Sequence, residues 1–145
     1  VVLMEMDGQR YLPIWIGADV ADAIALHLQG VEVPRPLTHD LLRVVIEVLG
    51  ASVSRVLIND IRDNTFYARI VFDIGGRHAE IDSRPSDAIA LAVRTSVPIY
   101  AEENVLDGAG IYPSPEIREA KTEPDDDGLG VFGEFLDSIE PDDQE

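Results

Sequence analysis

The order of apolar and polar residues predicts a hairpin of two strands at the start of the chain. Residues 2–6 and 11–16 are rich in apolar side chains, partly in alternation, and Asp7-Gly8 separates them. Alternation with a period of two is typical of strands, and an Asp-Gly pair is a frequent hairpin turn. We therefore expect two antiparallel strands, the first of them truncated because the chain begins within the pattern.

Helical spacing replaces this alternation after the second strand. Asp19 is in position to cap a helix that runs through about Gln29, and Val20, Ile24 and Leu28 form one apolar stripe along it.

A second helix is predicted after a proline-rich segment. Val33-Pro34-Arg35-Pro36 must be extended, because each proline disfavours helical conformation in the residue before it. Thr38 is then a candidate N-cap, Asp40 falls in the positive first turn, and Gly50 is expected to end the helix.

The second half of the chain shows a similar order of elements. Asp63-Asn64 and Gly75-Gly76 are turn signals between β-rich runs, and Pro85 is suited to the first position of a helix. The expected elements are strands at 53–61, 65–74 and from Gly76 to about Asp82, a helix at 85–95, an extended segment at 98–100 and a short helix at 102–109.

An internal repeat supports this division into halves. The pentapeptide Asp-Ala-Ile-Ala-Leu occurs at Asp22–Leu26 and again at Asp87–Leu91, which predicts a duplicated supersecondary unit. Strands grouped before helices predict the α+β class. Residues shared by both copies are expected to serve architecture, so Asp87, which Asp22 matches, is expected to stabilise a helix start.

Charge divides the chain differently. Residues 122–145 hold 10 of the 28 acidic side chains and none of the 11 basic ones, and the net charge is −17. We expect a domain at 1–121 and an acidic, largely disordered tail at 122–145, in which Leu129, Phe132 and Leu136 have the spacing of a short helix. A net-acidic body argues against nucleic-acid binding through a diffuse basic surface, but not against a local arginine-lined pocket.

Some classes are excluded by composition. The chain has no cysteine, so disulfides, thiolate catalysis and thiolate metal sites are ruled out. Apolar runs are too short to span a bilayer, and no signal-peptide pattern is present in the segment. We therefore expect a cytoplasmic protein with no membrane association.

Several segments together resemble the bifunctional nuclease domain family, over about residues 2–112. They are Tyr11–Gly17, Pro34–Leu42, Thr65–Ala68 and Asp82–Leu91. The resemblance implies a duplicated unit of three strands and two helices that closes into one barrel-like mixed sheet with flanking helices. It also implies a homo-oligomer, with a dimer as first choice, and hydrolysis of DNA and RNA. The family brings no agreed set of catalytic residues.

Phosphodiester cleavage needs a base and positive charge on the phosphate. His39, at a helix start after a proline-bounded loop, is the candidate base, and packing or capping is the alternative explanation. Asp40 is a candidate orienting residue, although a first-turn carboxylate facing the helix dipole needs no function. Arg35 and Arg84, each fixed before a proline, are candidate phosphate contacts or partners in ion pairs.

Oxygen ligands for a cation are the next candidates. Asp82 is expected to support catalysis, and with Asp60 and Asp87 it forms a weak candidate set for Mg²⁺ or Mn²⁺. Thr65 is expected to contact substrate on its hairpin. Two hypotheses follow: a weak, metal-assisted nuclease, and a non-catalytic oligomeric binding or regulatory module.

Overall fold

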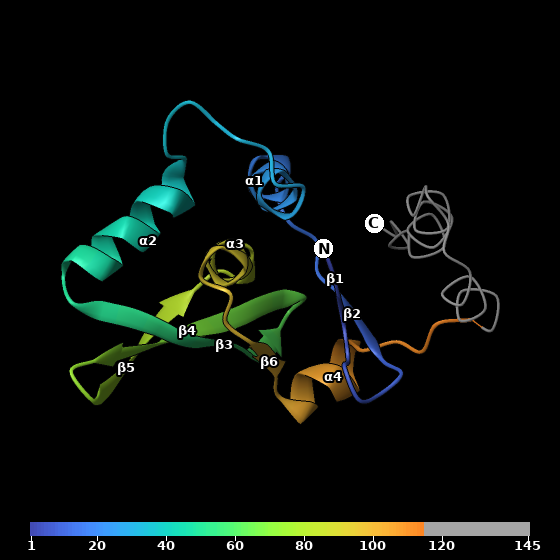
Figure 1. The fold of residues 1–145 in the computed structure, drawn as a ribbon. Helices are drawn as coiled ribbons and strands as arrows, with labels where there is room; N and C mark the ends of the chain where they lie inside the picture. The colour runs from blue at the N-terminus through green and yellow to red at the C-terminus, as the bar shows by residue number, and fades with distance from the viewer. Residues whose placement is uncertain (115–145) are drawn as a thin grey trace.

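The computed structural model describes residues 1–114, in which helices lie over one face of a mixed sheet of four strands (Figure 1). In this sheet the strand order is β5 (Arg77–Ser83), β4 (Thr65–Ile74), β3 (Ala51–Arg62) and β6 (Ile99–Ala101), and a separate pair is formed by β1 (Val2–Met4) and β2 (Tyr11–Pro13). The helices are α1 (Ala18–Leu28), α2 (Thr38–Val48), α3 (Pro85–Thr95) and α4 (Glu103–Ala109).

Two tight turns set the register of the sheet, as the sequence predicts. Asp63 and Asn64 have φ values of 49° and 59°, and Gly75 and Gly76 have 59° and 85°. Two successive left-handed residues match the twist of an antiparallel pair, so β3–β4 and β4–β5 are tight hairpins. Only β6 runs parallel to its neighbour, β3.

Helix α3 occupies the centre of the molecule. It starts with Pro85 at its first position, as predicted, and its pentapeptide copy packs Ala88, Ile89 and Leu91 into the core with the sheet. Helices α1 and α2 both pack against α3. The other copy, on α1, is more exposed at Asp22 and Ala25, because α1 lies outside α3 rather than on the sheet.

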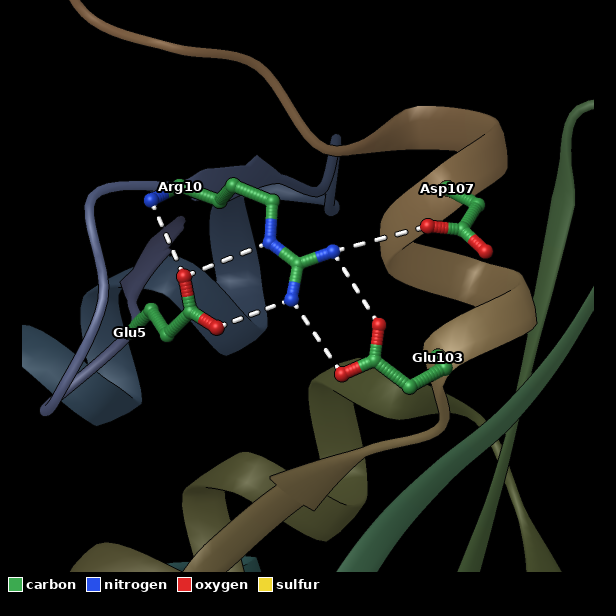
Figure 2. Close-up of polar contacts among 4 residues, drawn as sticks. All are labelled: Glu5, Arg10, Glu103 and Asp107. Carbon is green, nitrogen blue, oxygen red and sulfur yellow. Dashed lines mark hydrogen bonds and ion pairs between the residues drawn. The ribbon is translucent and has the colours of Figure 1, made fainter.

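The β1–β2 hairpin is fastened to α4 by one arginine. The guanidinium of Arg10 lies between Glu5 on one side and Glu103 and Asp107 of α4 on the other (Figure 2). Its Nη2 donates to Glu5 Oε1 at 2.9 Å, and Nη1 donates to Glu103 Oε2 at 3.1 Å. Hydrogen bonds to these two carboxylates raise the pKa of Arg10 above its ordinary value, so its charge is permanent. A bridge from Tyr11 to Ile111 joins the same two regions.

The α+β class is confirmed, with differences in detail. Within residues 1–114 the strands form two sheets and no closed barrel, so the barrel-like closure stays a prediction. The first half contributes two strands rather than three, whereas the extended segment expected at 98–100 is present as β6, between α3 and α4. Asp19 and Thr38 were each expected as N-caps, but both lie inside their helices, after Gly17 and Leu37.

Two further points concern the limits of the domain. None of the helices in the described part is both long and apolar enough to cross a membrane. The boundary predicted at residue 121 and the acidic tail lie outside the described residues.

Replacing Leu91 by alanine should lower the free energy of unfolding by about 2–5 kcal/mol, because its fully buried side chain would leave a cavity between α3 and the sheet. Leu28→Ala is the matched control, since Leu28 is largely exposed and its loss should cost less than about 0.5 kcal/mol. Urea titration followed by circular dichroism measures both, and equal losses would contradict the central position of α3.

Candidate functional site

A cleft of about 530 Å³ opens where α1, the start of α2 and the start of α3 meet. Because Pro36 precedes α2 and Pro85 opens α3, stiff backbone fixes both helix starts at its edge. Its polar lining comes from Asp19, Asp22, Thr38, His39, Arg84 and Asp87. Three of the candidate residues named from the sequence, His39, Arg84 and Asp87, therefore share one cleft.

His39 forms a dyad with Asp87 across the α2–α3 interface. The imidazole Nε2 lies 3.0 Å from Asp87 Oδ1, although the two residues are far apart in sequence, and the His39 side chain is only 9% exposed. Burial favours a neutral Asp87, but hydrogen bonds from Arg84 and His39 outweigh this and hold its pKa below the ordinary value. An ionised carboxylate only accepts hydrogen bonds, so Nε2 must carry the proton.

The other imidazole nitrogen is open. No hydrogen bond is made to His39 Nδ1 within residues 1–114. This atom is also not one of the fully buried side-chain atoms of that region that lack a hydrogen-bond partner. With the proton on Nε2, the lone pair of Nδ1 is free to accept a proton at the cleft. His39 is thus arranged as a base oriented by a carboxylate.

Arg84 supplies the positive charge of the cleft. Its Nε donates to Asp87 Oδ2 at 2.8 Å, and this hydrogen bond raises the pKa of the guanidinium above its ordinary value. Its terminal nitrogens make no hydrogen bond within the described chain, and the side chain is largely exposed. The N–H groups of these two terminal nitrogens, which lie in one plane, are therefore available to an anionic ligand such as a phosphate.

Asp40 lies in the first turn of α2, as predicted. It accepts from the backbone N–H of Leu37 at 2.8 Å and from Arg94 Nε at 2.7 Å. The Leu37 hydrogen bond, with Arg94 in support, outweighs burial and lowers the pKa of Asp40. The carboxylate, next to His39 in the sequence, therefore closes the first turn of α2 and pairs with Arg94.

Arg94 is the buried partner in this pair, with a side chain only 2% exposed. Besides Asp40, it donates to the carbonyl oxygens of Ala90 in its own helix and of Ala23 in α1, each at 3.0 Å. One guanidinium thus connects α1, α2 and α3 directly behind the cleft.

The remaining candidates lie elsewhere. Antiparallel partners share a face of a sheet, so Asp82, opposite Arg69, and Asp60, opposite Tyr67, lie on the face turned away from the core residues Ala68 and Ile70. The predicted grouping of Asp60 and Asp82 with Asp87 does not occur, because α3 and its Asp87 lie on the core side. Arg35 is exposed and does not line the cleft.

Thr65 lines a separate cleft of about 280 Å³, which also reaches Arg84.

The contacts of two residues were not predicted from the sequence. Asp87 was a weak candidate cation ligand and was otherwise expected to stabilise a helix start, as its match to Asp22 suggested, but it is the third residue of α3 whereas Asp22 is the fifth of α1, so the two carboxylates occupy different turns. Arg94 gave no signal beyond being a basic residue near the end of an apolar helix. Only the contact with α2 reveals its function.

Metal binding receives limited support from the geometry. Asp19, Asp22 and Asp87 line the cleft, but no three histidine or carboxylate side chains in the described part of the chain lie close enough together to hold a metal ion.

A mixed α+β domain with a histidine–aspartate dyad and an arginine at one cleft is compatible with a hydrolase of phosphate esters. Comparison with known sequences identifies the class: the model of the bifunctional nuclease domain matches residues 1–114, and the chain belongs to this family.

Individual relatives extend the comparison. An uncharacterized protein of Mycobacterium tuberculosis is 51% identical over 144 residues, which cover 99% of this chain and 86% of the relative. Bifunctional nuclease 2 of Oryza sativa subsp. japonica is 30% identical over 89% of this chain, and bifunctional nuclease 2 of Arabidopsis thaliana is 26% identical over 89%. The chain spans only 41% and 40% of these two plant proteins.

Asp40→Asn should lower the free energy of unfolding at neutral pH by about 3 kcal/mol, because it leaves the buried Arg94 charge without a counterion. The folded-state pKa of Asp40 is depressed, so its contribution is present above about pH 4 and is lost as the pH falls through the lower folded value. The difference between variant and parent should therefore shrink in acid.

The control for this prediction is Glu47→Gln, which removes the exposed Arg43–Glu47 pair and should cost less than about 0.5 kcal/mol. Urea titrations at several pH values measure both variants. A loss for Asp40→Asn as small as the control's would show that the Arg94 contact is dispensable.

Proposed function

We propose that the chain hydrolyses phosphodiester bonds of DNA and RNA, with His39 as general base and Arg84 as phosphate contact. The observation that carries the proposal is the array His39–Asp87–Arg84, in which one carboxylate joins a base and a cation at the edge of one cleft. The names of the plant relatives point to the same chemistry.

The roles follow from the geometry of the array. Arg84 holds and neutralises the phosphate with its free terminal nitrogens, while Nδ1 of His39 accepts a proton from the attacking water. The water oxygen bonds to phosphorus, the ester bond breaks, and the leaving oxygen is protonated from solvent. Asp87 fixes the tautomer of the imidazole and balances the charge that forms on it.

Divalent cations have no assigned step in this proposal. The three carboxylates of the cleft supply ligands of the type that Mg²⁺ or Mn²⁺ prefers, but they do not converge into a three-ligand group. A parallel assay with a chelator decides whether a cation assists.

His39→Gln should reduce the cleavage rate of single-stranded DNA and RNA about 10²–10⁴-fold, because the amide cannot accept the proton. Asp87→Asn should also reduce the rate, since an amide can donate to Nε2 and thereby place the imidazole proton on Nδ1. His78→Gln, on the exposed β4–β5 hairpin, is the matched control and should cleave at the parental rate. Equal rates for His39→Gln and His78→Gln in gel assays of pure protein would exclude this site.

A second candidate function, a non-catalytic oligomeric binding module, is favoured by the outer face of α2. On this helix His39 and Asp40 turn toward α3 and Ile46 packs against the core, whereas the other apolar residues are exposed, with Val48 and Leu49 at 79% and 77%. The apolar face consists of Leu41, Leu42, Val44, Val45, Val48 and Leu49.

We infer that a second copy of the chain covers this face, whether or not the protein is catalytic. The face carries no charge, so two copies can meet about a two-fold axis without repulsion despite the net charge of −17. An apolar face of this extent on a helix is typical of an interface between subunits.

Val45→Glu should convert the dimer to a monomer at micromolar concentration, because it would bury a carboxylate against the apolar face of the second copy. Glu47→Gln, on the other side of α2, should leave the assembly unchanged. Sedimentation velocity reports the mass of each. A parental protein that sediments as a monomer at every concentration would rule out this interface.

A further inference from the structure

A second cleft lies beside the dyad and differs from the first in its chemistry. It has a volume of about 280 Å³ and lies between the end of β2, the β3–β4 turn and the start of α3. Its lining includes Trp15, Asn64, Thr65, Phe66, Arg84 and Ser86. Arg84 lines both clefts, so a ligand in the second cleft is held next to the dyad.

The charges of the two clefts are opposite in sign. Three aspartates and one arginine line the first cleft, whereas Arg84 is the only charged residue that lines the second. A phosphate that approaches Arg84 from the first cleft passes Asp19 and Asp22, which line it, whereas neither aspartate is among the residues that line the second cleft. An anionic chain is therefore favoured on the side of the second cleft.

Trp15 is the most unusual residue of this second cleft. Its side chain is 66% exposed, although large aromatic residues of a monomer are mostly buried. It follows the core residue Ile14 in the segment that joins β2 to α1, and it lines the cleft together with Arg84. An exposed indole beside an arginine offers a planar surface on which a nucleobase can stack.

Uncharged polar groups complete the lining. Ser86 is only 7% exposed, and its hydroxyl makes no hydrogen bond within residues 1–114. The hydroxyl oxygen is nevertheless not one of the fully buried side-chain atoms of that region that lack a partner. The amide of Asn64 and the hydroxyl of Thr65 lie on the exposed turn of the β3–β4 hairpin. These groups can donate to and accept from the edge of a base without adding charge.

We propose that this cleft binds one nucleobase of a single-stranded nucleic acid, stacked on Trp15, with the adjoining phosphate on Arg84. The inference rests on the proposed nuclease function and assigns its substrate class: unpaired strands, whose bases are free to leave the stack. Within a duplex the base is already stacked and paired, so it cannot reach the indole without being flipped out.

Trp15 is the only tryptophan of the chain, so its fluorescence reports on this cleft alone. The experiment titrates the full chain carrying His39→Gln, which keeps the strand intact, with a single-stranded oligodeoxyadenylate of about ten nucleotides. A strand of the same length without bases serves as the reference for phosphate contacts. We expect quenching by the first strand and an affinity about ten-fold weaker for the abasic one.

Variants separate stacking from simple apolar contact. Measured by fluorescence anisotropy of a labelled strand, Trp15→Leu should weaken binding about ten-fold, whereas Trp15→Phe, which keeps an aromatic ring, should weaken it less than about three-fold. Tyr100→Leu removes an exposed aromatic residue on β6 and should leave affinity unchanged. Binding by Trp15→Leu at parental affinity, or saturation without any change in tryptophan emission, would overturn the proposal.

Cleavage assays of the single variants then distinguish this proposal from the proposed function. If Trp15→Leu binds weakly but His39→Gln cleaves at the parental rate, the base site stands and the catalytic assignment fails. If His39→Gln is inactive but Trp15→Leu binds and cleaves normally, the catalytic assignment stands and the base site fails.

Discussion

The arrangement of the candidate site depends on the buried ion pair between Arg94 and Asp40. The three nitrogens of Arg94 donate hydrogen bonds to three helices. These hydrogen bonds replace those that the guanidinium would make to water if it were exposed. Since Asp40 follows His39 directly, the same pair fixes the first turn of α2 and with it the imidazole. A structural charge pair therefore sets the position of a neighbouring residue that faces the cleft.

The repeated pentapeptide illustrates how one local sequence acquires two roles. Both copies form helix, but α3 lies against the sheet and begins two residues closer to its aspartate than α1 does. Asp87 therefore reaches across to α2, where it accepts from His39 and Arg84, while Asp22 lines the cleft from the middle of its helix. The same pentapeptide forms helix in both places, and the difference in helix start makes the two carboxylates unequal.

Local chemistry explains which features could be predicted from the sequence. Asp63-Asn64, Gly75-Gly76 and Pro85 determine backbone conformation over a few residues, and the structure places each in its expected turn or helix start. The pairing of β6 with β3 and the face on which Asp82 lies depend on register between distant segments. His39 and Arg84 were found because a proline adjoins their loops, whereas the partnership of Arg94 with Asp40 has no local signature.

Charge distinguishes the two clefts beside Arg84. Hydrogen bonds from Arg84 and His39 keep Asp87 a carboxylate, which holds the proton on Nε2, whereas Asp19 and Asp22 in the first cleft repel a polyanion. Arg84 lines both clefts, and its Nε is used by Asp87 while its outer nitrogens make no hydrogen bond within residues 1–114. In the proposed base site, a strand that enters along Trp15 would therefore meet this positive charge first and would present its phosphate to the dyad from the cleft that has no aspartate in its lining.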